Sequence, residues 1–308
     1  MLMQMPRMIA LALVAPLAVA AHLTATSLQV DAKVGEILAA ARQALGGEPA
    51  LSKVQTLTVT GATRRIMGER EIAGDVTLDF LLPDKMKRTD SFGMPGGPMM
   101  ERVSVVNGNE VWDDSTNRGG GGFMMRMGGP GGPGGPGPGG PGREPTEEDR
   151  QRMREAQARR MKSEMARHAL AFLLRTDAPA TYAGEAEAED GKADVIEIKP
   201  EGGTAMKLFI DQATHLPLMI SYEGVLPRMM VARQGQRPTP EEIEKMRSEP
   251  PQTAVFEIRY SEYKKVDGVL LPHLITTGAN GNVTEEWTIE KFKLNPALKP
   301  ESFVKKGS

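Results

Sequence analysis

The residue types that most often perform catalysis are scarce in this chain, and none of them falls into a catalytic pattern. The four histidines are His22, His168, His215 and His273, and there is no cysteine. The histidines lack the H-E-x-x-H spacing of zinc peptidases, and no G-x-S-x-G segment is present to hold a nucleophilic serine. His215 and His273 stand beside prolines at predicted strand ends, which is typical of turn or surface histidines. The sequence therefore predicts a protein that is not an enzyme and needs no cofactor.

Two weak patterns could be read as metal sites, and neither is complete. Asp113, Ser115 and Asn117 are spaced like the start of a calcium loop, but Arg118 stands where glycine is required and no glutamate closes the loop. The 20 methionines could supply thioethers, which select Cu(I). They show no compact repeated spacing with histidine, so we predict no metal site.

Methionine is better explained by its apolar character, because its side chain is flexible and polarizable and suits an adaptable surface. Two groups stand out, one near a Gly-rich stretch and one in a helical stretch: Met94, Met99, Met100, Met124, Met125 and Met127, then Met153, Met161 and Met165. Whether this surface is a ligand-binding lid or ordinary core packing stays open from the sequence.

The N-terminus has the features of a secretory signal peptide. Arg7 precedes an apolar run over residues 8–19, and Ala18 and Ala20 form an A-x-A arrangement. A membrane anchor is the alternative, but the run is shorter than the ~20 residues that span a bilayer and it contains Pro16. We expect residues 1–20 to be removed and the mature protein to be a soluble periplasmic monomer with at most transient membrane contact. A net charge of −2 argues against a nucleic-acid partner.

Alternation of apolar and polar residues predicts strands, and turn residues separate them. Phe256, Ile258 and Tyr260 alternate with polar residues, and Asp267-Gly268 then supplies a hairpin turn. Asn280-Gly281 supplies a second turn, so the chain is predicted to end in an antiparallel meander. Further strand-like runs occupy 57–66, 71–82, 85–92, 102–107, 110–113, 181, 194–199, 205–210 and 216–222, for about eleven strands in all.

Two helices and two insertions complete the predicted organisation. Val34 to Leu45 reads as an amphipathic helix, and Thr146 caps a long helix with an apolar stripe that includes Met161, Met165 and Phe172. Its other positions are largely basic, Arg167 among them, and read as a solvated face. Residues 118–144, rich in Gly and Pro, and 227–251 read as insertions into one domain at 31–308.

Several of these motifs occur in an order that resembles the periplasmic lipoprotein-carrier family (LolA/LolB-like). The residues that carry the resemblance are Gly74, Pro83, Lys85, Lys87, Arg88, Asn107, Gly108, Trp112, Asp211, Thr214, Leu216, Pro217, Tyr260, Tyr263, Val266, Asp267, Gly268, Pro272, Asn295 and Phe303. The resemblance implies an unclosed β-barrel whose concave face is covered by helices and encloses an apolar cavity for acyl chains.

The sequence thus predicts a mainly β protein with helices (α+β), in which a large curved antiparallel sheet carries a helical lid. The expected ligand is a lipid, a lipoprotein acyl chain or another hydrophobic molecule. The alternative is a regulatory or scaffold protein that senses the envelope and binds a protein partner. The expected lining of the cavity is Val76, Leu78, Phe80, Val103, Trp112, Phe256 and Trp287 from the sheet, with Met161, Met165 and Phe172 from the lid.

Overall fold

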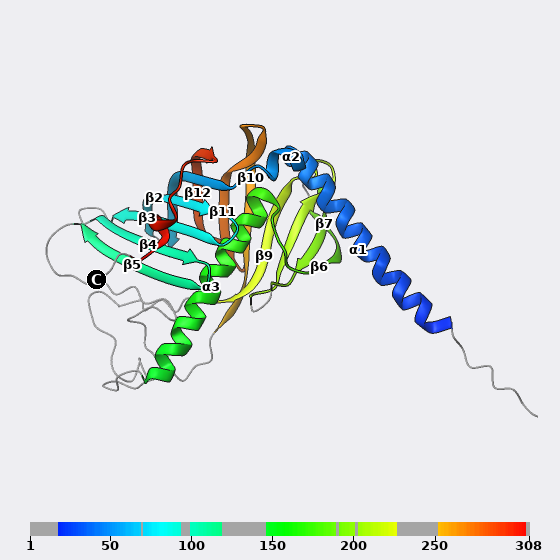
Figure 1. Cartoon of the computed structure of the whole chain (residues 1–308), viewed down its shortest axis with the longest axis horizontal. Helices are drawn as coiled ribbons and strands as arrows, with labels where there is room; N and C mark the ends of the chain where they lie inside the picture. The colour runs from blue at the N-terminus through cyan, green and yellow to red at the C-terminus, as the bar shows by residue number, and fades with distance from the viewer. Residues whose placement is uncertain are drawn as a thin grey trace, which may run out of the picture.

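The computed structural model describes residues 18–68, 70–93, 99–118, 146–188, 191–200, 203–226 and 252–305. Within these residues, twelve strands form one antiparallel sheet in the order β5-β4-β3-β2-β1-β12-β11-β10-β9-β8-β7-β6 (Figure 1). The sheet does not close, because β5 and β6 are free edges. The predicted fold class is confirmed. The signal peptide and both insertions lie outside the described residues, apart from residues 18–20, which begin α1, and Arg118, which ends β5.

The strands follow the predicted runs, and several extend beyond them. The helices are α1 (Ala18–Leu45), α2 (Glu48–Leu51), α3 (Glu147–Leu173) and the 3-10 helix η2 (Pro300–Phe303). The strands are β1 (Thr56–Met67), β2 (Arg70–Leu81), β3 (Lys85–Gly93), β4 (Met99–Asn107), β5 (Glu110–Arg118), β6 (Ala180–Ala188), β7 (Gly191–Ile198), β8 (Met206–Asp211), β9 (Pro217–Val225), β10 (Thr253–Val266), β11 (Val269–Ala279) and β12 (Asn282–Leu294).

The two turns predicted for the terminal meander are present. Asp267 and Gly268 have φ values of 48° and 92°, and Asn280 and Gly281 have φ values of 49° and 79°. Positive φ at both central residues matches the right-handed twist of the flanking strands and selects Asp or Asn followed by Gly. These turns therefore fix the register of β10, β11 and β12.

A bulge bends the middle of the sheet. The pairing of β1 with β12 shifts register between Thr60 and Gly61. A Cβ atom at Gly61 would overlap the carbonyl oxygen of Thr288, so only glycine fits at this point. Bulges increase local twist and bend the strand that carries them. The sheet consequently curves around α3 (Figure 1).

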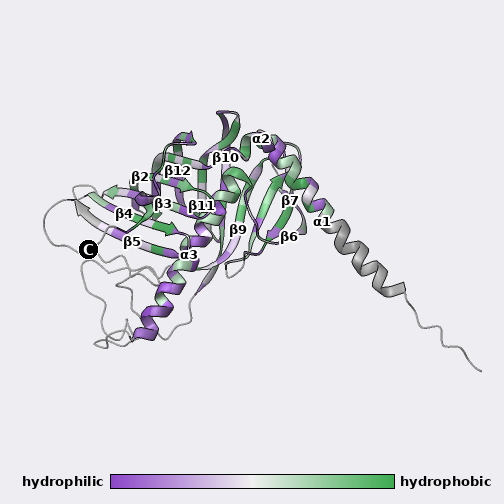
Figure 2. Cartoon of the chain, viewed as in Figure 1, coloured by the Kyte–Doolittle hydropathy of each residue, from purple (hydrophilic) through white to green (hydrophobic). Residues whose placement is uncertain are grey.

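Helix α3 follows β5 in the sequence and leads into β6, so it joins the two edges of the sheet. Thr146 caps it as predicted: its hydroxyl accepts from the Asp149 amide, and the Asp149 carboxylate accepts from the Thr146 amide. The first half of the helix is hydrophilic and largely exposed (Figure 2), whereas buried residues begin at Met161. The C-terminal half is therefore the part that packs on the sheet.

Helix α1 packs its apolar stripe against the same core. Val34, Ile37, Ala41 and Leu45 are buried, as their spacing predicts. The guanidinium of Arg42 donates to the carbonyl oxygen of Leu174 at 2.9 Å, which joins the ends of α1 and α3. In the part of the chain that the structure describes, no helix is both long enough and apolar enough to cross a membrane.

Candidate functional site

The candidate site lies between α3 and the face of the sheet that packs on it, here called the inner face. Directly paired residues of antiparallel strands share a face, so pairing identifies its members. Arg88 pairs with Leu78, Leu78 with Val59, and Val59 with Phe292. These residues form one row of the inner face across β3, β2, β1 and β12.

An aromatic stack joins α3 to this face. The imidazole of His168 lies between two rings, with 5.5 Å between centroids on each side, Phe172 on α3 and Trp287 on β12. The guanidinium carbon of Arg88 lies 4.8 Å from the centre of the Trp287 ring, a cation–π distance. Phe80 meets both His168 and Phe172 edge-on. The sequence thus places aromatic rings, not small apolar residues, at the centre of the interface.

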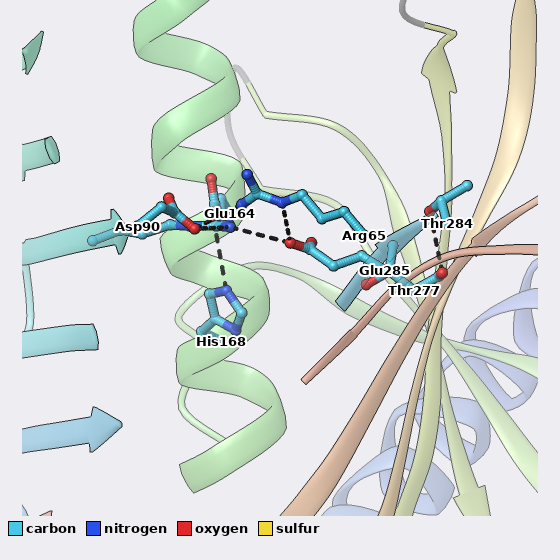
Figure 3. A network of polar contacts seen from close by, with 8 residues as sticks. Arg65, Asp90, Glu164, His168, Thr277, Thr284 and Glu285 are labelled. Atoms are coloured by element: carbon cyan, nitrogen blue, oxygen red, sulfur yellow. Dashed lines mark hydrogen bonds and ion pairs between the residues drawn. The ribbon is translucent and has the colours of Figure 1, made fainter. Parts of the chain in front are cut away.

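Next to this stack lies a charged cluster, defined as Arg65, Arg88, Asp90, Glu164 and Glu285. Arg88 donates two hydrogen bonds of 2.8 Å to the carboxylate of Asp90 and one of 2.6 Å to Glu164 on α3. Arg65 donates to Asp90 and to Glu285, each at 2.7 Å. Figure 3 shows Arg65, Asp90 and Glu285 of the sheet converging with Glu164 of α3. Because Arg88 and Glu164 come from different layers, their contact ties α3 to the sheet.

Within this cluster, electrostatics keeps Arg88 and Glu164 ionised. Burial alone would raise the pKa of Glu164, but the Arg88 guanidinium holds it well below its usual value. Burial likewise opposes the charge of Arg88, but Glu164, Asp90 and Glu285 raise its pKa well above the usual value. Two arginines against three carboxylates leave the cluster with a surplus of one negative charge. Burial lowers the pKa of His168 despite nearby Glu164, so the imidazole in the stack is neutral at pH 7.

A different set of polar atoms at the same interface has no hydrogen-bond partner. Within the described residues, the buried side-chain atoms without a partner are the Nε of Arg167, the Nδ1 of His168, the hydroxyl of Tyr260 and the Nε1 of Trp287. We call these the unpaired set. All four belong to α3 or to the inner face: Trp287 pairs with Ile275, and Ile275 pairs with Tyr260. Buried polar atoms are almost always paired, so their concentration here marks this interface as unusual.

The structure brings eight of the ten predicted lining residues to this interface. Phe256 is half-buried on the inner face, where its ring stacks on Tyr222 with centroids 5.4 Å apart. The other seven are buried in one core cluster: Val76, Leu78, Phe80, Met161, Met165, Phe172 and Trp287.

Val103 and Trp112 lie on the opposite face. Val105 pairs with Trp112 and with Lys87, which alternate with the inner-face residues of their strands. Val103 is two residues from Val105 and shares its face. The indole of Trp112 donates to the carbonyl oxygen of Phe303 at 3.1 Å, so it holds η2 against the outer face. Alternation along a strand gives two faces but does not say which one meets the helix.

Sequence reasoning missed the charged cluster and misplaced two other groups. Arg167 was expected on a solvated face but is buried, with 7% of its surface exposed. His273 was expected in a turn or on the surface but is buried in β11, where its ring meets Phe292 edge-on. The available signal was Arg88 and Asp90 at alternate positions of β3, a spacing that puts opposite charges on one face. Glu164, the partner of Arg88 on α3, is 76 positions away in the sequence, and that separation hides the pairing.

Within the described residues, no group of three or more His, Asp or Glu side chains is placed to hold a metal ion. The carboxylates of the charged cluster are already engaged by arginines. The arrangement offers aromatic surface, a polar connection between helix and sheet, and free hydrogen-bond donors.

No protein-family model and no curated protein matches the chain. Among solved structures, it is similar to a LolA superfamily protein from Nitrosomonas europaea, at 12% identity and a TM-score of 0.42, over 86% of this chain and 97% of that one. A DUF1329 family protein from Desulfovibrio piger matches at 11% identity and a TM-score of 0.43, over 88% and 97%. A putative outer membrane lipoprotein-sorting protein domain from Vibrio parahaemolyticus matches at 13% and 0.39, over 80% and 88%. Sequence identities and TM-scores this low carry no argument about function, so the function of this protein must be argued from its own residues.

Proposed function

We propose that this protein is an exported periplasmic carrier or binding protein that buries a hydrophobic ligand between α3 and the inner face of the sheet, with α3 as the lid. The observation that carries the proposal is the concentration of the unpaired set at this one interface. A permanently closed interface would be expected to pair such atoms or replace them by apolar groups, because each one left unpaired costs about 1–3 kcal/mol.

The polar contacts of α3 with the sheet suit reversible opening. Besides the Arg88–Glu164 contact, Gln157 donates to the Asp113 carboxylate at 2.8 Å, and Lys162 donates to the side-chain oxygen of Asn109 at 3.1 Å. When α3 separates from the sheet, these groups can exchange their partners for water, so the net cost per hydrogen bond is only about 0.5–1.5 kcal/mol, more for charged ones.

Separation of α3 would expose aromatic and methionine side chains to a ligand. Met161, Met165 and Phe172 face it from the helix, and Phe80 and Trp287 from the sheet. Each ligand methylene buried there contributes about 0.8 kcal/mol, so an acyl chain can offset the loss of the closed packing. Methionine adapts to ligands of different shape because its side chain is unbranched and has three rotatable bonds.

Tying α3 to the sheet tests this proposal. The chain has no cysteine, so Asp113→Cys and Gln157→Cys together can be bridged by a short bifunctional maleimide without side reactions. We expect the bridged protein to lose binding of an environment-sensitive acyl probe by at least tenfold, because the lid cannot open.

A matched bridge between Glu187→Cys and Lys192→Cys lies within the β6–β7 hairpin, where the native side chains are 3.5 Å apart and exposed, and it should leave binding unchanged. Equal binding by both bridged proteins would contradict a lid function for α3. Absence of probe binding by the unmodified protein, together with co-purification of a protein partner, would favour the scaffold alternative.

A further inference from the structure

Arg167 is a buried cation without a counter-ion in direct contact. It lies on α3, with 7% of its surface exposed. Among the described residues, no carboxylate lies within ion-pair distance of its guanidinium and no hydrogen-bond acceptor engages it, and its Nε atom is fully enclosed. The ring centre of Tyr222 lies 4.1 Å from the guanidinium carbon of Arg167. A cation–π contact offsets part of the burial cost but satisfies none of the N–H donors.

The nearest acid on the same helix is already engaged. Glu164 precedes Arg167 by three positions, a spacing at which helical side chains are neighbours. Its carboxylate instead accepts the 2.6 Å hydrogen bond from Arg88. The surplus negative charge of the charged cluster can balance Arg167 only at a distance, because its carboxylates bond to Arg65 and Arg88. The buried Nε of Arg167 therefore has no acceptor among the described residues.

Two further buried donors without a partner lie on the inner face, and one of them, the Tyr260 hydroxyl, is close enough to Arg167 for its charge to affect the pKa of that hydroxyl. The hydroxyl of Tyr260 is buried without a partner, and burial raises the pKa of that hydroxyl well above its usual value, so it keeps its proton. The indole N–H of Trp287 belongs to the same row of paired residues as Tyr260. A guanidinium, a phenol and an indole can all donate hydrogen bonds at neutral pH, and the arginine adds one positive charge.

The apolar surface beside these donors runs toward the edge of the interface. Tyr222 stacks on half-buried Phe256, with the two rings nearly parallel at 13°. Gly224 makes room for that ring, since a Cβ atom there would lie 2.9 Å from Cε2 of Phe256. A flat aromatic surface therefore leads from Arg167 to a partly exposed position.

We infer that Arg167, assisted by the Tyr260 hydroxyl and the Trp287 indole, binds the singly charged anionic head group of an amphiphile whose chain lies on the inner face. This inference rests on the proposed function and adds the class of ligand. One unpaired guanidinium balances one negative charge, which fits a fatty-acid carboxylate or a phosphodiester and disfavours a neutral lipid. A charge-assisted hydrogen bond contributes about 1.5–3 kcal/mol, which corresponds to a preference of at least about tenfold for the anion.

Displacement of the acyl probe from the full chain by three ligands of equal chain length tests the inference: myristate, myristyl alcohol and the corresponding lysophosphatidylglycerol. We expect one or both anions to displace the probe at concentrations at least about tenfold below the alcohol. The ratio should fall to about one in Arg167→Met and stay unchanged in Arg160→Met, which changes an exposed arginine of the same helix. Preference for myristate assigns a carboxylate, and preference for the lysophospholipid assigns a phosphodiester; either result supports the inference.

Three outcomes would overturn it. Equal displacement by alcohol and anions leaves the proposed function standing but removes the anion site, whereas no displacement by any ligand removes both. A large loss of thermal stability in Arg167→Met would mean that the arginine already has a structural partner, because deleting an unpaired buried charge should leave stability unchanged or higher. Tyr260→Phe is an independent check that keeps Arg167 in place: it removes only a hydroxyl without a partner, so anion preference should fall several-fold with stability retained.

Discussion

Replacing Arg88 should destabilise the protein far more than replacing a neighbouring arginine in a similar ion pair. In Arg88→Leu, Arg65 is the remaining ion-pair partner of Asp90 and Glu285, and Glu164 loses its arginine, so the charged cluster goes from one surplus negative charge to two. These side chains are largely withdrawn from water: 15% of Arg88 and 7% of Asp90 are exposed. Water cannot compensate the carboxylates fully while the interface stays closed.

The expected magnitude follows from that burial. Removal of one partner from a buried ion pair costs about 3–5 kcal/mol, because the other charge stays buried without compensation. For a domain of this size, 1 kcal/mol changes Tm by about 2–4 °C, so we expect a decrease of about 6–20 °C. Glu164→Gln should cost less than Arg88→Leu, because it removes the surplus negative charge and leaves Arg88 bound to Asp90.

Thermal melts of the two variants beside Arg102→Leu provide the test. Arg102 lies on adjacent β4 and reaches Asp113 at 3.3 Å, but 42% of its side chain is exposed. Exposed pairs contribute about 0–1 kcal/mol, so this control should lose at most a few degrees. Equal melting temperatures for Arg88→Leu and Arg102→Leu would refute the claim that the charged cluster holds α3 to the sheet.

Three further predictions concern pH, the bulge and the first insertion. Because the folded-state pKa of His168 lies below its usual 6.5, the unfolded chain binds the proton more readily, so Tm should fall as pH drops below about 6.5. Tm should fall again below about 4.5, where Glu164 takes up a proton in the unfolded chain while Arg88 holds its folded-state pKa well below 4.5. In melts across pH, His168→Phe should abolish the upper stage and keep the lower one. Gly61→Ala should cost about 1–3 kcal/mol in denaturant unfolding because its Cβ atom meets the Thr288 carbonyl, whereas Gly35→Ala, in open space on α1, should be neutral or stabilising. Replacement of residues 119–144 by a short Gly/Ser linker should leave Tm within a few degrees, since glycine and proline supply little apolar surface; a larger decrease would show that the segment packs on the domain.

The fold was predictable because its determinants are local. The Asp267-Gly268 and Asn280-Gly281 turns, the Thr146 cap and the period-2 runs each act over a few residues, and the structure confirms each of them. Several motifs behind the family resemblance also have structural roles: the Asp211 carboxylate accepts from the Thr214 amide and hydroxyl, and the Tyr263 hydroxyl donates to the Pro217 carbonyl at 2.6 Å. A resemblance carried by such residues predicts architecture better than it predicts a ligand.

The candidate site was predictable only in its apolar half. Phe80 and Trp287 could be found because apolar residues at alternate positions of a strand form a buried face, and Phe172 could be found because it lies on the apolar stripe of a helix. Glu285 and Arg65 could not, because they are 220 positions apart and each alone reads as a surface charge. The position of Arg167 was not predicted for a related reason. The buried face of α3 is wider than the apolar residues of the helix indicate, because it also includes Arg167, whose guanidinium lies over the Tyr222 ring. The sequence contains charges, but their partners are set by the tertiary fold.

The charged cluster and the unpaired set are connected through one carboxylate. Glu164 and Arg167 are three positions apart on α3 and would pair with each other on an isolated helix. In the folded protein, the guanidinium of Arg88 on β3 donates to the Glu164 carboxylate instead. Within the described residues, the Nε of Arg167 then has no hydrogen-bond partner. The contact that holds α3 to the sheet is therefore the same contact that keeps Glu164 away from the proposed anion site. If Arg88 is removed, Glu164 becomes free to pair with Arg167. Arg88→Leu should then lose preference for myristate over myristyl alcohol, although Arg88 itself is assigned no contact with the ligand. Retention of the full preference in that variant would show that Glu164 does not compete for Arg167 and that the two groups act independently.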